Sequence, residues 1–145
     1  MDNTQADFDQ MFLEMCFLVA ERSRAKRNKV GAIITKHNRP ISLGYNGTPV
    51  GFDNACEDTN GDTLECVVHA EVNALCFLAR THESTEGTTL YSTLSPCVKC
   101  ASMIIQAGIK RVVYRNRYRY DGGVRMMKEA GIEVVRLHPN FNQDD

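Results

Sequence analysis

Two short motifs restrict this chain more than any other feature of its sequence: His69-Ala70-Glu71 and, further along, Pro96-Cys97-Val98-Lys99-Cys100. One imidazole and two thiols can supply three ligands to a tetrahedral zinc ion and leave its fourth position for water. Three protein ligands are typical of a catalytic zinc site, because a structural site fills all four positions with protein. The sequence therefore predicts a fold that brings His69, Cys97 and Cys100 to one point.

Glu71 lies two residues after His69 and is the natural proton carrier of such a site. A water activated by zinc needs a nearby carboxylate that takes its proton and passes it to a leaving group. The pair Cys97 and Cys100, taken alone, is also typical of the redox-active pairs of thioredoxin-like proteins. We favour the metal site, because a redox pair leaves His69 and Glu71 without a role.

The hydrophobic pattern predicts helices and strands that alternate along the chain. Apolar residues recur at three- and four-residue spacing over 6–21 and indicate an amphipathic helix, with the stripe Phe8, Met11, Phe12, Met15, Cys16 and Val19. Further elements are expected as helices at 67–79, 97–107 and 124–130, and as strands at 30–34, 40–45, 88–94, 109–114 and 132–137. This order predicts one domain over 1–145, a three-layer α/β/α fold around a mixed five-stranded sheet. The polar tail at 138–145 is expected to fray.

The expected metal ligands fall at the beginnings of two predicted helices. His69 and Glu71 lie in the first turn of one helix, and Cys97 and Cys100 lie in the first turn of the next. The unpaired N–H groups and the positive dipole end of a helix N-terminus favour thiolates and other anions there. Because each helix follows a loop or a strand end, the two N-termini can converge at one edge of the sheet.

Two basic stretches each allow two interpretations. Residues 21–29, the basic segment, are either a solvated charged linker or a phosphate-binding loop, since arginine offers a bidentate fork to phosphate. Residues 115–123 alternate basic and aromatic side chains, which can stack a base and hold a phosphate or can form an edge strand. The sequence by itself leaves both pairs of alternatives open.

The corner Gly44-Tyr45-Asn46-Gly47-Thr48-Pro49 must turn sharply and can approach a ligand closely. Residues 50–65, the long loop, follow without a hydrophobic period, and loops of this length are usually functional or disordered. Cys56 and Cys66 lie in or beside this loop. They can bind a second metal, or they can be spectator thiols. The second alternative is favoured, because no metal-type spacing joins them.

Composition and charge limit the partners. The net charge of -1 provides no overall field that attracts nucleic acid, and we expect no nucleic-acid partner. Six cysteines without a secretory leader indicate a reducing compartment, so we expect a cytoplasmic protein. The apolar run at 11–20 is interrupted by Glu14 and is too short to span a bilayer, so no membrane partner is expected.

The two metal motifs match the pattern of zinc-dependent nucleobase deaminases, H-x-E followed by P-C-x-x-C. Together with the corner at 44–49 they resemble the deoxycytidylate (dCMP) deaminase family, within the cytidine deaminase-like superfamily, and the resemblance covers nearly the whole chain. It implies hydrolysis of dCMP to dUMP and ammonia, which supplies dUMP for dTMP synthesis. Zinc would be held by His69, Cys97 and Cys100, and Glu71 would move the proton.

The same resemblance implies contacts with the substrate and with effectors. Asn46 would contact the deoxyribose hydroxyl, and the basic segment would meet the 5′-phosphate. The implied substrate-binding residues are Asn46, Ser23, Lys26, Arg27, Ala70, Ser95 and Tyr120. The family is commonly a homohexamer that dCTP activates and dTTP inhibits, with Mg2+ accompanying the triphosphate. The implied effector-binding residues are Gly44, Asn46, Gly47 and Gly51.

Many members of the family also hold a second, structural zinc. Its ligands include a cysteine in the part that matches the basic segment and a cysteine in the loop that follows. The matching position here is Ala25, whereas Cys56 remains. The sequence therefore leaves a second zinc open.

Two other functions fit parts of the sequence. A deaminase of free cytidine or deoxycytidine, or of a base in RNA, would share every residue of the zinc site, and preference for the nucleoside over the monophosphate would identify the former. A zinc-stabilised nucleic-acid-binding module would use the basic stretches and would bind oligonucleotides in a salt-dependent way. Such a module has no use for Glu71.

Overall fold

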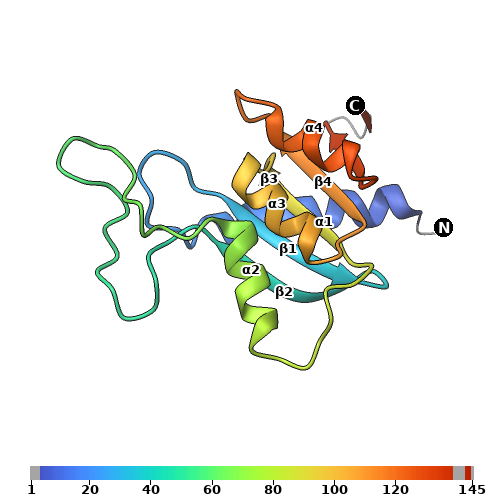
Figure 1. Ribbon diagram of the computed structural model, residues 1–145, viewed down its shortest axis with the longest axis horizontal. Coiled ribbons are helices and arrows are strands. Elements are labelled where there is room, and N and C mark those ends of the chain that lie inside the picture. The colour runs from blue at the N-terminus through green and yellow to red at the C-terminus, as the bar shows by residue number, and fades with distance from the viewer. Residues whose placement is uncertain (1–3, 139–142, 145) are drawn as a thin grey trace.

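The computed structural model describes residues 4–138 and 143–144 of the protein (Figure 1). Its helices are α1 (Gln5–Ala20), α2 (Ala70–Ala79), α3 (Val98–Gln106) and α4 (Gly122–Glu129). Its strands are β1 (Gly31–Lys36), β2 (Arg39–Tyr45), β3 (Thr89–Leu94), β4 (Arg111–Asn116), β5 (Glu133–Leu137) and β6 (Gln143–Asp144). The predicted order is confirmed through β5, with ends shifted by a few residues. Within the described residues, no helix is long and apolar enough to cross a membrane.

The strands form one mixed sheet in the order β2-β1-β3-β4-β5-β6. β1 is antiparallel to both β2 and β3, whereas β3, β4 and β5 run parallel to one another. Parallel neighbours need a crossover connection, which α3 and α4 provide. The predicted mixed sheet of five strands is therefore confirmed, and β6 extends it by one short strand.

Part of the tail at 138–145 pairs with the sheet. Residues 143–144 run antiparallel to β5, whose edge offers backbone N–H and C=O groups to a further strand. Residues 139–142 and 145 of this tail lie outside the described residues.

Helices cover both faces of the sheet and confirm the three layers (Figure 1). Successive residues of a strand point to opposite faces, so Ile33 and Ile34 enter different cores. The core beneath α1 contains Phe12, Leu13, Cys16, Ile33, Tyr91, Val113, Val135 and Leu137. The core beneath α2, α3 and α4 includes Ile34, Ala74, Leu78, Leu90, Ala101, Ile104, Val112, Tyr114, Val124 and Met127.

The apolar stripe predicted for α1 needs one correction. Met11 is 44% exposed, and the buried face of the helix instead includes Asp9 and Gln10. A hydrophobic pattern assigns such polar residues to the solvent side, because burial of a carboxylate requires partners that other elements supply.

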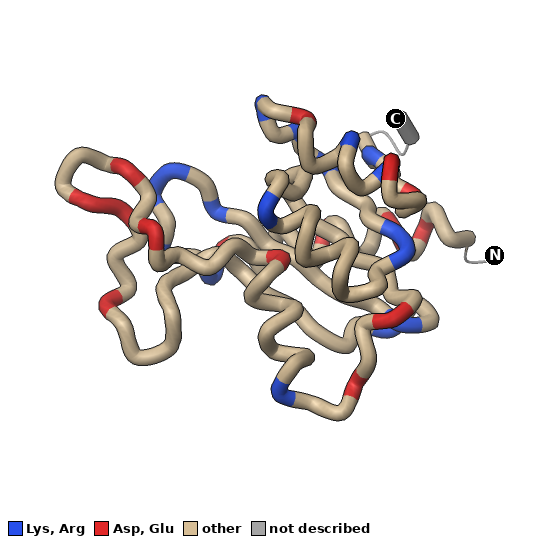
Figure 2. Tube along the Cα trace, in the orientation of Figure 1, with Lys and Arg blue, Asp and Glu red and all other residues tan. Residues whose placement is uncertain are grey.

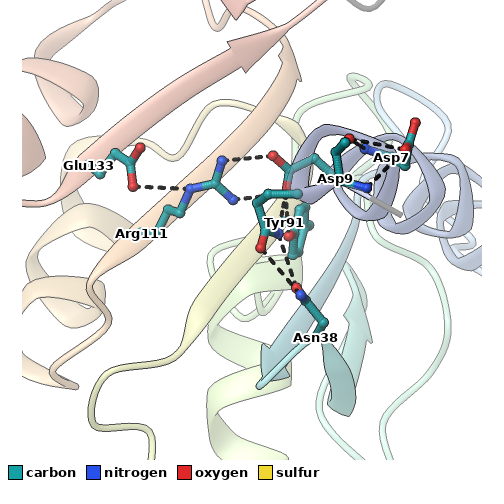
Figure 3. Close-up of polar contacts among 8 residues, drawn as sticks. Asp7, Asp9, Asn38, Tyr91, Arg111 and Glu133 are labelled. Carbon is teal, nitrogen blue, oxygen red and sulfur yellow. Dashed lines mark hydrogen bonds and ion pairs between the residues drawn. The ribbon is translucent and has the colours of Figure 1, made fainter. Parts of the chain in front are cut away.

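Those partners form a buried polar network between α1 and the middle of the sheet (Figure 3). The carboxylate of Asp9 accepts hydrogen bonds from Arg111 Nη1 at 2.8 Å and Nη2 at 2.7 Å, and from the Tyr91 hydroxyl at 2.6 Å. On its outer side, Arg111 Nε lies 3.1 Å from Glu133 Oε2. The bidentate geometry ties α1 to β3 and β4 and compensates the buried charge.

Candidate metal centre and catalytic cavity

Each predicted metal ligand lies at the beginning of a helix. His69 is the N-cap residue of α2, Cys97 is the N-cap residue of α3, and Cys100 lies in the first turn of α3. The helix that contains Glu71 begins later than predicted, because the backbone of Val68 pairs with Gly47 in an antiparallel bridge. The helix N-termini predicted to meet at the site therefore do meet, with two ligands at the caps themselves.

Each of the two helix starts packs closely against the backbone of a glycine in a neighbouring element. A Cβ on Gly44 of β2 would stand 2.5 Å from the carbonyl oxygen of Ala70, at the start of α2. A Cβ on Gly123 of α4 would stand 2.2 Å from the carbonyl oxygen of Pro96, just before α3. Only glycine fits at these positions, so the backbone contacts fix both halves of the metal site.

The three ligand atoms form a compact group. His69 Nδ1 lies 3.2 Å from Cys100 Sγ and 3.6 Å from Cys97 Sγ, and all three atoms lie within 4.8 Å of one another. Zinc bonds of about 2.0–2.3 Å in a tetrahedron place neighbouring ligand atoms about 3.6 Å apart. The donor set and its spacing therefore fit a zinc ion held by three protein ligands.

The thiols of this metal triad, His69, Cys97 and Cys100, differ in acidity. Hydrogen bonds from Cys100 and His69 lower the pKa of Cys97 to about 3. The adjacent Cys97 sulfur, together with burial, raises the pKa of Cys100 above its ordinary range. The hydrogen bond to Cys97 also raises the pKa of His69. One negative charge is thus concentrated on Cys97, and a divalent cation would favour a second thiolate at Cys100.

Glu71 lies beside the metal triad on the first turn of α2. Its side chain is buried, with a residue exposure of 4%, and burial raises its pKa above that of an ordinary glutamate. The Ser92 hydroxyl lies 3.5 Å from Glu71 Oε1, at the limit of a hydrogen bond. A carboxyl beside a metal site can accept a proton from water and return it to a leaving group.

A cavity of about 330 Å³, the metal-site cavity, opens over the triad and Glu71. Its walls come from the basic segment, the long loop, the starts of α2 and α3, and the loop after β4. Four further residues that the sequence analysis assigned to the substrate line this cavity, namely Arg27, Asn46, Ala70 and Ser95.

The structure does not bring the other three assigned substrate residues into this cavity. Ser23 lines a different cavity, and Lys26 lines neither of the two. Tyr120 is 57% exposed, and its ring lies against Gly122. Tyr118 lines the metal-site cavity in its place.

The region 115–123 resolves one pair of alternatives. β4 has β3 on one side and β5 on the other, so the region does not form an edge strand. The loop that follows β4 is anchored by Ser95, whose hydroxyl oxygen accepts a 2.6 Å hydrogen bond from the Tyr118 backbone N–H. Tyr118 and Arg119 then face the metal-site cavity.

Asn46 and Ser23 shape the basic segment from the inside. Asn46 accepts a hydrogen bond from the Val30 backbone N–H at 2.9 Å and donates one to the Asn28 carbonyl oxygen at 2.8 Å. The Ser23 hydroxyl donates to the Asn46 carbonyl oxygen at 2.8 Å and accepts from the Ala25 backbone N–H at 3.1 Å. Both side chains therefore hold backbone, and Asn46 does so at the wall of the cavity.

A second cavity of about 930 Å³ lies on the other side of the basic segment. All four residues assigned to an effector line it, namely Gly44, Asn46, Gly47 and Gly51. Arg22, Arg24 and Lys29 also line it, so its charge is suited to phosphate groups. Asn46 belongs to the walls of both cavities.

No second metal group forms around Cys56 and Cys66 in the described part of the chain. The metal triad is the one cluster of three or more His, Cys, Asp or Glu side chains there with converging ligand atoms. Cys56 is buried, with its thiol 3.6 Å from the Asn54 carbonyl oxygen, and Cys66 is exposed.

Sequence reasoning missed several residues at the cavity, namely Asn28, Glu57, Tyr118 and Arg119. The three segments that contribute them, namely the basic segment, the long loop and the loop after β4, lack a regular period, so no pattern separates a side chain that faces the site from its neighbour. The alternation of basic and aromatic residues at 115–123 was the one available signal, and it indicates the segment but not the residue.

Known proteins match this fold and site. The sequence model of one protein family, the cytidine and deoxycytidylate deaminase zinc-binding region, matches residues 6–116 of this chain. The deoxycytidylate deaminase of Enterobacteria phage T4 is 36% identical over 86% of this chain and 87% of its own length. That of Mus musculus is 31% identical over 94% of this chain and 83% of its own length. The dCMP deaminase of cyanophage S-TIM5, solved in complex with dCMP and dUMP, superposes with a TM-score of 0.90 at 40% identity, covering 93% of this chain and 100% of that one.

The fold and the metal triad with its buried carboxylate define a zinc-dependent hydrolytic deaminase of the cytidine deaminase-like fold. More narrowly, the chain belongs to the cytidine and deoxycytidylate deaminase family.

Proposed function

We propose that the protein deaminates dCMP to dUMP and ammonia. One observation carries the proposal: Arg27 and Arg119 line the same cavity as the metal triad and Glu71. A nucleoside needs no cation in its pocket, whereas a 5′-phosphate is bound well by arginine. The T4 and mouse relatives are deoxycytidylate deaminases, and the S-TIM5 enzyme at 40% identity was solved with dCMP and dUMP, which supports the same substrate here.

Zinc held by His69, Cys97 and Cys100 would supply Lewis acidity and lower the pKa of water toward neutrality. Glu71 takes a proton from the attacking water as its oxygen bonds to C4 of cytosine, and it delivers that proton to N3. The remaining hydroxyl proton then passes through Glu71 to the exocyclic nitrogen, the C4–N4 bond breaks, and ammonia leaves. The atoms balance as dCMP plus water giving dUMP plus ammonia.

The burial of Glu71 suits this double role. Burial raises the pKa of Glu71, which favours its protonated form during the transfer from water to the base. Asn46 is proposed to meet the deoxyribose hydroxyl, which would share the amide with the Asn28 and Val30 backbone groups.

We further propose that the second cavity binds dCTP as activator and dTTP as inhibitor, with Mg2+ on the triphosphate. Support comes from its glycine-rich corner and from the basic side chains of Arg22, Arg24 and Lys29. Exposed apolar residues beside this cavity, Leu43, Val50, Phe52 and Phe77, favour assembly, and we propose a homohexamer.

The proposal extends to the setting of the enzyme. We propose that residues 1–145 act as one catalytic domain, because one sheet supports both halves of the site. The unpaired thiols of the described residues favour a reducing compartment, so we place the protein in the cytoplasm, where dUMP feeds dTMP synthesis.

The deciding experiment measures ammonia release from dCMP, deoxycytidine and cytidine by the zinc-loaded protein, with and without dCTP. We expect turnover of dCMP, raised by dCTP. Preference for a nucleoside would contradict the proposed substrate and support the nucleoside deaminase. Turnover of none of the three would refute the proposed reaction and direct attention to a base within a longer nucleic acid.

A further inference from the structure

The basic segment has neither helix nor strand, yet its backbone is held at several points by side chains. Ser23 and Asn46 hold its two ends through side-chain hydrogen bonds. The middle of the segment is held by Glu57 from the long loop. Glu57 Oε2 accepts hydrogen bonds from the backbone N–H groups of Lys26 at 2.9 Å and Arg27 at 3.2 Å.

The position of Glu57 is itself well supported. Glu57 pairs with Thr63 in an antiparallel bridge, and the Leu64 backbone N–H donates to the Cys56 carbonyl oxygen at 2.8 Å. Asp58 closes the turn between these residues through bonds to backbone N–H groups. In Figure 2 the basic segment lies beside the acidic stretch of the long loop, at the end of the molecule that carries the cavity.

Arg27 is the point at which this contact reaches the substrate site. Its backbone N–H is held by Glu57, and Arg27 is one of the residues that line the metal-site cavity. Among the described residues, the Arg27 guanidinium makes one ion pair, with Asp62 at 3.9 Å, in which both side chains are more than half exposed. Such an exposed pair is weak, so a phosphate group can replace Asp62 without a large cost.

We propose that Glu57 is a positioning residue for the 5′-phosphate: by binding the backbone N–H groups of Lys26 and Arg27, it sets the guanidinium of Arg27 over the metal-site cavity. This inference rests on the proposed function, because it deepens the recognition of the monophosphate. Glu57 acts through Arg27 and needs no contact with the reacting atoms. One carboxylate oxygen shared by two consecutive amides holds both in a single orientation.

The test compares Glu57→Ala with Glu65→Ala. Glu65 is an exposed acidic residue at the end of the same loop, and it makes no hydrogen bond or ion pair with the described residues. We expect Glu57→Ala to raise KM for dCMP about tenfold or more, since a misplaced binding group costs up to about 10²-fold. The inhibition constant of inorganic phosphate should rise in parallel, while kcat stays within about twofold. Glu65→Ala should change neither constant.

Two further variants make the outcome decisive. Glu57→Gln keeps an oxygen acceptor and should restore most of the affinity. In an Arg27→Ala background, Glu57→Ala should add no further rise in KM, because the two residues act in series. A fully additive double variant, or a Glu57→Ala enzyme with lowered thermal stability and normal KM, would overturn the proposal. Failure of the wild-type protein to turn over dCMP would refute the proposed function instead.

Discussion

The molecule buries ionisable groups in two regions, and the two differ in how their charge is compensated. Behind the sheet, Asp9 receives two hydrogen bonds from Arg111 and one from Tyr91, so the protein itself satisfies the carboxylate. At the metal site, Glu71 has a hydroxyl 3.5 Å away, and no lysine or arginine among the described residues forms an ion pair with it.

The difference distinguishes a buried charge that stabilises the fold, at Asp9, from a buried group available for a reaction, at Glu71. The network around Asp9 is complete, so it stabilises the packing of α1 and has no capacity for a ligand. Around Glu71 and the metal triad the compensation is partial: His69 Nδ1 contacts both thiols, yet burial still raises the pKa of Glu71. Ionisable groups with incomplete partners inside the protein are typical of sites where a metal ion or a substrate supplies the missing interaction. Substitutions in the two regions, and a change of pH, should therefore have effects of different kind and size.

Removal of a metal ligand should have the largest effect. Cys97→Ala leaves two protein ligands, so we expect loss of zinc as well as activity. Zinc content by atomic absorption and ammonia release from dCMP measure the two losses. Cys76→Ala, which removes an exposed thiol, is the matched control and should keep one zinc per chain. Stoichiometric zinc in the Cys97→Ala protein would refute the ligand assignment.

Glu71→Gln should keep zinc and fold but lower kcat by about 10³-fold or more, because the proton shuttle is lost. Circular dichroism and zinc content establish that the variant is intact, and ammonia release gives the rate. An intact variant with near-normal turnover would remove Glu71 from the mechanism.

Arg111→Met should act on stability and not on chemistry. The change leaves the Asp9 carboxylate buried without its cation, which costs about 3–5 kcal/mol of unfolding free energy. Glu133→Ala removes only the outer partner, whose side chain is 66% exposed, and should cost about 0–1 kcal/mol. Urea unfolding measures both. Equal costs for the two variants would show that the buried side of the network is not the stabilising one.

The smallest effect should appear in the acid dependence of stability. Burial alone would raise the pKa of Asp9, but the hydrogen bonds from Arg111 and Tyr91 lower it below the ordinary value. The folded protein therefore holds the ionised form more tightly than the unfolded chain, whose aspartate pKa is about 3.9. The stabilisation is complete above that pH and is lost as the pH falls through the folded pKa. Unfolding free energies between about pH 2 and 6 should fall less steeply for Asp9→Asn, and identical slopes would contradict this origin.

The strongest sequence predictions depended on short local patterns. The period of apolar residues placed the helices and the strands of the sheet, because that period follows from helix and strand geometry. The H-x-E and P-C-x-x-C motifs predicted the metal triad through the ligand chemistry of their residues, although the ligands come from two helices. The fold class and the metal centre could therefore be predicted from the amino-acid sequence alone.

What only the tertiary structure decided lies where two segments meet. The burial of Asp9 depends on Arg111 and Tyr91, which lie far from it in the sequence, and no local sequence pattern predicts it. The loops show the same limit, since Tyr118 and not Tyr120 faces the cavity. Glu57 likewise reaches the basic segment only through the folded long loop. The amino-acid sequence by itself determines the apolar period that places each helix and strand. The direction of a loop side chain is set by the partner against which it packs in the folded protein.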